Sequence, residues 1–159
     1  PLVEGGDAAT AEVERAVHMA NELLDSANPP RAILFETALH GELLNLDEED
    51  NKRHYAGGMS ANRINAGLGS IIAQVLEHCG QDRIAGLYTT GGDTMVNVCY
   101  QLGAQCIELL DYVIPQTDIG RLVGSYDGLP VVGKGGLTGN DHTACDIVDR
   151  LFREATRKN

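Results

Sequence analysis

Ile84-Ala-Gly-Leu-Tyr-Thr-Thr-Gly-Gly-Asp-Thr94 contains the most informative structural pattern of this chain. Its first seven residues form an apolar run of strand length, and the two glycines follow at once. Over residues 94–102, Met95, Val98 and Leu102 recur at the spacing of one helical face. A strand that passes through two glycines directly into a helix is typical of an α/β domain.

Similar patterns continue on both sides of this stretch. The predicted elements are helices over 10–25, 60–80 and 141–153, strands over 31–36, 84–90 and 105–110, and a pair of short strands at 121–124 and 130–132. Ser60 is expected to cap the second helix, residues 115–120 form a turn-rich connection, and the acidic run at 47–50 is a solvated loop or helix face. The alternation predicts a single α/β domain over 1–159: a largely parallel sheet flanked by helices, with a short β-hairpin before the C-terminal helix.

The charge balance excludes two classes of partner. Twelve Lys and Arg against 23 Asp and Glu give a formal net charge of −11, which repels nucleic acid and anionic membrane surfaces. The four cysteines have no Cys-x-x-Cys spacing, and no apolar run is long enough to span a membrane or opens the chain as a signal peptide. We therefore expect a cytoplasmic protein with reduced thiols, no nucleic acid partner and no membrane association.

The turn Gly91-Gly92-Asp93-Thr94 is the first candidate site. Its glycines allow the backbone to approach a ligand closely, and the following helix directs free N–H groups outward, so the turn predicts a phosphate site. Thr94 adds a hydroxyl donor, and Asp93 can face Mg²⁺ or a ribose hydroxyl. The alternative is a tight strand-to-helix turn that Asp93 or Thr94 caps.

The loop Gly133-Lys-Gly-Gly-Leu-Thr-Gly139 is the second candidate. It does not form a P-loop, because Gly135 stands where that motif needs Ser or Thr, and its glycines are also spaced too far apart for the dinucleotide fingerprint. What remains is a glycine-rich loop able to close over a nucleotide, with Lys134 to neutralise phosphate. The alternatives are a flexible connector and a surface lysine.

The order of these motifs resembles a known family. Gly-Leu-Tyr-Thr-Thr-Gly-Gly-Asp-Thr at 86–94, Leu102-Gly103, Pro115 and Leu-Pro-Val-Val-Gly-Lys-Gly-Gly at 129–136 are similar to the C-terminal nucleotide-binding domain of the four-carbon acid sugar kinases. The resemblance is strong from Gly86 to Gly139. Before Gly86 it rests on a compatible order of helices and strands.

The resemblance implies the ATP-binding portion of a kinase that phosphorylates a tetronate or oxo-tetronate with ATP and Mg²⁺. It assigns nucleotide binding to Gly91, Gly92, Asp93, Thr94, Lys134, Gly135 and Gly136, and it assigns no catalytic residue or protein metal ligand to this chain. The family's aspartate-rich motif and its serine-bearing strand have no counterpart here, and Thr138 replaces a frequent aromatic residue.

These departures predict a fragment that starts inside the second domain of a two-domain kinase. The N-terminal sugar-binding domain of the same polypeptide would then be its partner, the small sugar acid its co-substrate, and the fragment alone would bind without turnover. The oligomeric state stays open, a homo-oligomer included. The alternatives are a non-catalytic binding module for an anionic metabolite and a structural or partner-binding domain whose glycine loops are only turns.

Overall fold

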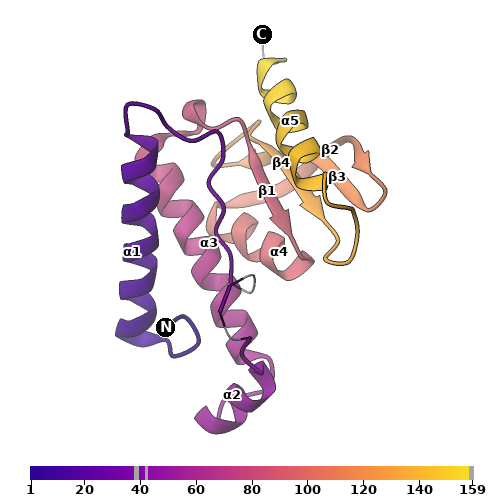
Figure 1. The fold of residues 1–159 in the computed structure, drawn as a ribbon. Helices are drawn as coiled ribbons and strands as arrows, with labels where there is room; N and C mark the ends of the chain where they lie inside the picture. The colour runs from indigo at the N-terminus through magenta and orange to yellow at the C-terminus, as the bar shows by residue number, and fades with distance from the viewer. Residues whose placement is uncertain (38–39, 42, 158–159) are drawn as a thin grey trace.

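A four-stranded mixed sheet forms the centre of the structure, a computed structural model that describes residues 1–37, 40–41 and 43–157. The strands are β1 (Leu87–Thr90), β2 (Ala104–Ile114), β3 (Thr117–Gly124) and β4 (Pro130–Lys134), in the order β1-β4-β3-β2 (Figure 1). Only β1 and β4 pair in parallel, and the other two pairings are antiparallel. The expectation of a largely parallel sheet is therefore wrong, although the α/β class is correct.

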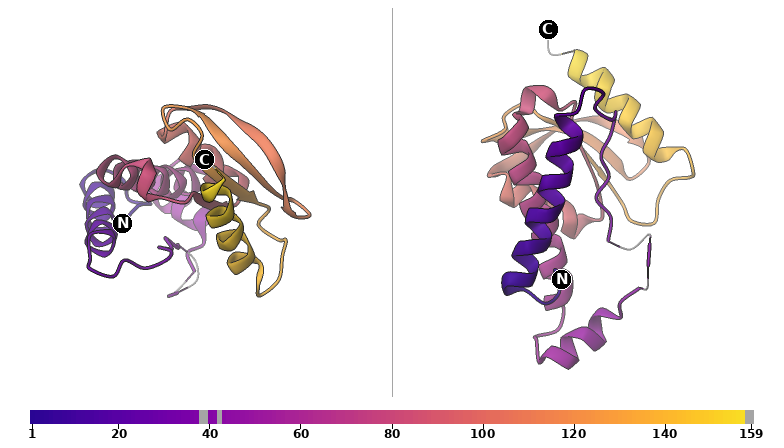
Figure 2. Two further views of the ribbon diagram at one scale, coloured as in Figure 1. Left: turned by 90° about the horizontal axis from the view of Figure 1, so that it is seen from above. Right: turned by 60° about the vertical axis from the view of Figure 1, so that its left-hand side comes forward.

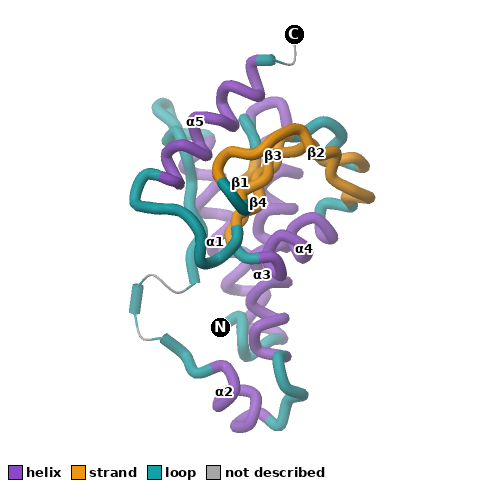
Figure 3. Tube along the Cα trace, turned by 90° about the vertical axis from the view of Figure 1, so that its right-hand side faces the viewer, coloured by secondary structure: helices purple, strands orange, loops and turns teal. Residues whose placement is uncertain are grey.

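Helices pack on both faces of this sheet. They are α1 (Gly6–Leu24), α2 (Leu46–Arg53), α3 (Met59–Cys79), α4 (Gly92–Gln101) and α5 (Thr143–Thr156), with a short 3₁₀ turn, η1 (Gln81–Arg83), after α3. Helix α1 lies along α3 (Figure 2), and α3 packs in turn against α4. The strands lie between α4 and α5 (Figure 3). No helix of the described residues is long and apolar enough to cross a membrane.

Two apolar clusters hold the layers together. The larger one joins α1, α3 and α4 to one face of the sheet through Val131 of β4. The smaller one joins α5 to the other face through Val132, the next residue. Because successive side chains of a strand point to opposite faces, Val131 belongs to the larger cluster and Val132 to the smaller one. Burial on both faces explains why β4 reads as a continuous apolar run in the sequence.

Residues 31–36 do not form the predicted strand. The strand was predicted from a short apolar run, and its side chains do alternate as in a strand: Ile33 and Phe35 pack against the larger cluster, while Leu34 between them is 72% exposed. The segment nevertheless has no place in the sheet, whose order is β1-β4-β3-β2. A strand needs a neighbour for its backbone N–H and C=O groups, and side-chain alternation alone does not supply one.

The sheet also differs from the prediction around the turns. β3 begins at Thr117, inside the stretch 115–120 that was expected to be a connection, so only Pro115 and Gln116 separate β2 from β3. Gln116 accommodates this tight turn with a φ of 60°. Downstream, β3 pairs antiparallel with β4 across residues 125–129, where the sequence indicates a hairpin.

The acidic run at 47–50 belongs to α2, and it contributes the cap of α3. Helix α3 starts with Gly58 as its N-cap, which has no side chain to accept a hydrogen bond. The Asp50 carboxylate replaces it, because Oδ2 accepts from the N–H of Gly58 at 2.7 Å and Oδ1 from the N–H of Ser60 at 2.8 Å. Ser60 is thus inside the helix, and its predicted role as the cap is wrong.

Candidate functional site

The two glycine-rich segments lie side by side at one edge of the sheet. β1 and β4 are parallel, so the glycines that follow these strands leave the sheet at the same end. Thr90 is opposite Lys134 in the register, and the N–H of Gly91 donates to the carbonyl oxygen of Lys134 at 3.0 Å. The structure therefore brings together the two segments that the sequence singled out.

The N-terminus of α4 is open toward this edge. Gly91 is the N-cap, with φ 92° and ψ 130°, a conformation that residues with a Cβ rarely adopt. No side chain of the described residues caps the helix, so the N–H groups of its first turn stay available. A Cβ at Gly92 would meet no atom within 4 Å. Unpaired donors and free space at a positive helix end suit an anion.

Thr94 makes a contact that the sequence did not predict. Its hydroxyl donates to Oδ1 of Asn65, a half-buried residue of α3, at 2.8 Å. The single hydroxyl hydrogen is thereby used, so Thr94 does not serve as the free donor that we expected from the sequence. Within its own helix Asn65 is only one polar position among several, and the packing of α3 against α4 is what brings it to the site.

Asp93 is the second side chain of this turn, and it is exposed. Its backbone carbonyl accepts from Nδ2 of Asn97 at 2.9 Å, a bond within the helix. A carboxylate in the first turn interacts favourably with the helix dipole, and carboxylate oxygens are the ligands that Mg²⁺ prefers. Asp93 is therefore compatible with a metal-bound anion and does not cap the helix.

Lys134 holds the second loop in place. The Nζ group of this half-buried residue donates to the carbonyl oxygens of Gly135 at 2.6 Å and Thr138 at 2.8 Å. The N–H of Gly135 donates in turn to the carbonyl oxygen of Gln116 at 3.1 Å, and a Cβ at Gly136 would meet no atom within 4 Å. Two of the three ammonium hydrogens thus brace the loop, and one remains for a ligand.

The N-terminus of α5 differs from that of α4, although both follow a parallel strand and a glycine loop. At α5 the Thr143 hydroxyl oxygen accepts from the N–H of Asn140 at 2.8 Å, and Oδ1 of Asn140 accepts from the N–H of His142 at 2.8 Å. These bonds hold the turn before the helix, and no side chain of the described residues caps α5 itself. The candidate site at α4 is therefore distinguished by the Gly91 turn and its hydrogen bond to Lys134, not by an open helix end alone.

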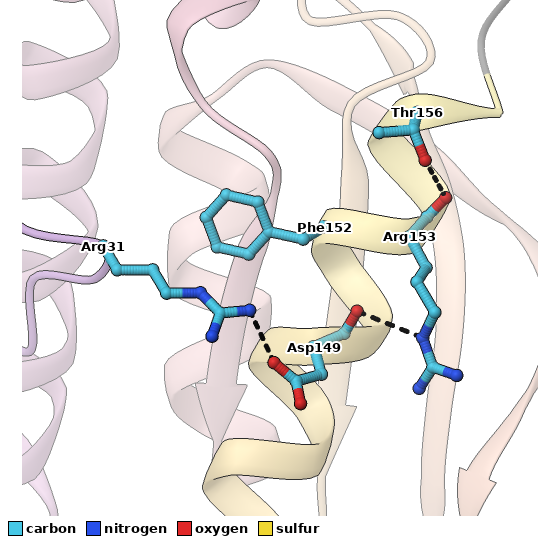
Figure 4. A pocket seen from close by; sticks show the side chains of 5 residues that line it. All are labelled: Arg31, Asp149, Phe152, Arg153 and Thr156. Carbon is cyan, nitrogen blue, oxygen red and sulfur yellow. Dashed lines mark hydrogen bonds and ion pairs between the residues drawn. The ribbon is translucent and has the colours of Figure 1, made fainter.

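The hollow in Figure 4 lies elsewhere, toward the C-terminal end of α5. This shallow hollow has a volume of about 550 Å³, and its polar groups bond to one another. Arg31 pairs with Asp149 at 2.5 Å and lies over the ring of Phe152, while Nε of Arg153 donates to the carbonyl of Asp149 at 3.3 Å. A second hollow, of about 320 Å³, lies between α1 and α3. Neither hollow includes a residue of the glycine loops.

No metal centre of protein ligands alone is present in the described part of the chain, where no three His, Cys, Asp or Glu side chains converge. Mg²⁺ does not require such a cluster, because it keeps several waters and is commonly held by one or two protein oxygens together with phosphates.

Comparison with known proteins shows which family the chain belongs to. Residues 1–144 match the model of the nucleotide-binding C-terminal domain family, and the chain belongs to that family. The resemblance to the C-terminal domain of the four-carbon acid sugar kinases is thereby confirmed.

Two characterised relatives are similar over most of this chain. The D-erythronate kinase of Heliobacterium modesticaldum is 34% identical over 149 residues, which are 92% of this chain and 33% of the relative. The D-threonate kinase of Salmonella typhimurium is 32% identical over 144 residues, 89% of this chain and 33% of the relative. The chain therefore spans about a third of the length of these relatives.

Two crystal structures of one protein of Bordetella bronchiseptica share the fold. Both are described as a domain of unknown function, a domain-swapped dimer with bound citrate. Each is 32% identical to this chain with a TM-score of 0.54, and they cover 63% and 62% of this chain and 25% and 24% of their own.

Proposed function

We propose that this chain is the ATP-binding part of a kinase that phosphorylates a four-carbon sugar acid of the tetronate or oxo-tetronate type. The observation that carries the proposal is the uncapped N-terminus of α4 beside the Lys134 loop. An open helix N-terminus, a lysine with a spare hydrogen, and open space at Gly92 and Gly136 together match the requirements of a polyphosphate. The names of the two kinase relatives supply the substrate class.

In this proposal each site residue has a defined task. The first-turn N–H groups of α4 bind phosphate oxygens, Gly135 and Gly136 let the loop approach them, and Lys134 offsets their charge. Oxygens of the Gly91–Thr94 turn would hold Mg²⁺ together with the phosphates, and the ion would supply further charge neutralisation. Phosphoryl transfer depends mainly on such positioning and electrostatic stabilisation, and this part of the polypeptide provides it for the nucleotide.

The sugar acid and its activating base belong, in this proposal, to the rest of a polypeptide about three times as long. The relatives' length supports that division, since this chain spans a third of it. We expect an N-terminal sugar-binding domain as the intramolecular partner, and residues 1–159 to bind nucleotide without turnover. The domain-swapped dimers of the Bordetella protein favour a homo-oligomeric assembly for the whole enzyme.

The test is calorimetric titration with ADP and Mg²⁺ of the wild type, Gly92→Val and Gly57→Val. A Cβ at Gly92 or at Gly57 would meet no atom within 4 Å, and neither glycine has a positive φ, so both variants should keep the fold. Only valine at 92 intrudes on the proposed phosphate position. Loss of ADP affinity in Gly92→Val with Gly57→Val unchanged supports the proposal, and an intact wild type that binds no ADP refutes it.

A second candidate is a non-catalytic module that binds an anionic metabolite. It is favoured by the citrate of the Bordetella structures, because an open helix N-terminus accepts carboxylate as well as phosphate. Titration with citrate separates the two. The kinase proposal expects ADP with Mg²⁺ to bind more tightly than citrate, and the reverse order favours the metabolite module.

A further inference from the structure

The bond between Asn65 and Thr94 gives α3 a part in the site. Asn65 lies near the start of α3 and reaches Thr94 on the first turn of α4, with the Thr94 hydroxyl donating to Asn65 Oδ1 at 2.8 Å. The same hydroxyl oxygen lies 3.6 Å from the position of a Cβ at Gly91, the N-cap. The Thr94 oxygen therefore lies at the N-terminus of α4, where a ligand of this helix end would bind.

A glycine keeps the two helices close enough for this contact. Gly69 lies one turn after Asn65 on α3, and a Cβ there would be 2.9 Å from the backbone oxygen of Asn97 on α4. No residue larger than glycine fits that approach without moving one of the helices. The Asn65–Thr94 contact thus depends on a backbone-to-backbone approach of α3 and α4.

The direction of the hydrogen bond determines what Thr94 can do for a ligand. A hydroxyl has one hydrogen and two acceptor lone pairs. With its hydrogen on Asn65, the Thr94 oxygen offers only lone pairs to the site. A phosphate oxygen has no hydrogen to donate and gains nothing from such a group. Mg²⁺, in contrast, accepts an electron pair, and a ribose hydroxyl can donate its hydrogen to one.

We propose that Asn65 is a positioning residue of the nucleotide site, which fixes the Thr94 hydroxyl so that its lone pairs meet Mg²⁺ or a hydroxyl of the nucleotide. This rests on the proposed function, because it presupposes a nucleotide at the N-terminus of α4. It goes beyond that proposal because it adds a residue from a different helix and defines which part of the ligand Thr94 meets. Phosphate contact is left to the backbone N–H groups and to Lys134.

The experiment is a double-mutant cycle read by ADP calorimetry. Asn65→Leu removes the acceptor at similar volume, Thr94→Val removes the hydroxyl at similar volume, and the double variant combines them. Asn62→Leu, an exposed position one turn earlier on the same helix, is the matched control. Circular dichroism and thermal unfolding without ligand establish that each variant is folded.

We expect Asn65→Leu to weaken ADP binding about tenfold, the effect of one hydrogen bond of roughly average net value, and Asn62→Leu to leave it unchanged. In the Thr94→Val background, Asn65→Leu should have no further effect, because its action passes through the hydroxyl. A residue that only supports the packing of α3 would weaken binding equally in both backgrounds. That result, or unchanged affinity in Asn65→Leu, overturns the inference.

Repeating the titrations in EDTA distinguishes the two ligand groups. An Asn65→Leu effect confined to the Mg²⁺ samples assigns the Thr94 oxygen to the metal ion, and an effect of equal size in EDTA assigns it to a nucleotide hydroxyl. Failure of the proposed function has a different signature, since the wild type itself would then bind no ADP.

Discussion

Replacing Gly91 or Gly92 by alanine should have opposite effects on stability, although the two glycines are neighbours. Gly91 has φ 92° and ψ 130°, which an alanine adopts only with strain of about 1–3 kcal/mol. The loss of glycine's entropy in the unfolded chain offsets about 0.4–1 kcal/mol of that cost. Gly91→Ala should therefore lower the free energy of unfolding by roughly 1–2 kcal/mol, a fall of about 2–8 °C in Tm for a chain of this length.

Gly92 is the first helical residue of α4 and lacks a positive φ, and its Cβ would meet no atom within 4 Å. Alanine there gains helix propensity, so Gly92→Ala should keep or raise Tm, by up to about 1 kcal/mol in stability. Differential scanning calorimetry of the two variants and the wild type, in the absence of ligand, measures the contrast. Equal melting temperatures for Gly91→Ala and Gly92→Ala would refute the backbone geometry on which the site depends.

Two further predictions concern charged groups. Lys134→Met removes both hydrogen bonds from the ammonium group to the loop carbonyls. Amide hydrogen exchange over residues 135–138, measured by mass spectrometry, should therefore accelerate about tenfold. An unchanged exchange rate contradicts the role of Lys134 in holding the loop. At the end of α1, hydrogen bonds from His78 and Arg83 hold the pKa of Asp25 below its ordinary value of 3.8. The stability from Asp25 is therefore present above that value and is lost as the pH falls through the lower folded-state pKa. In urea unfolding, Asp25→Asn should be less stable than the wild type at pH 7, and the difference in stability should disappear in acid. The difference should also be smaller in high salt, because Asp25 is exposed. A difference in stability that persists in acid contradicts the role given to the Asp25 carboxylate.

The predicted elements that the structure contains share one property: each is encoded by its own residues. Apolar spacing of three and four gave α1, α3, α4 and α5 to within a few residues at each end, apart from the four that α1 extends before residue 10. The strand, glycines and helix around Gly91 could be predicted for the same reason, since two glycines between an apolar run and an amphipathic helix leave few other conformations. The seven residues predicted to bind nucleotide follow from this pattern and from the family resemblance, and their roles remain predictions.

The predictions that the structure contradicts concern contacts between segments far apart in the chain. Residues 31–36 have the alternation of a strand but no place in the sheet, and the acidic run at 47–50 supplies the cap of another helix through Asp50. The site residues that sequence reasoning missed are of the same kind. Asn65 and Gln116 enter through contacts made from α3 and from the β2–β3 turn.

Local residue patterns were sufficient to predict the helices, the strand that runs into Gly91-Gly92, and the lysine-bearing glycine loop. The parallel pairing of β4 with β1, which sets the Gly91 turn beside Lys134, became known from the folded structure alone, as did the bond by which Asn65 occupies the one hydrogen of Thr94. Hydrophobic periodicity specifies which face of a segment is buried. It does not specify which backbone or polar group will lie opposite, because that depends on the packing of segments far apart in the chain.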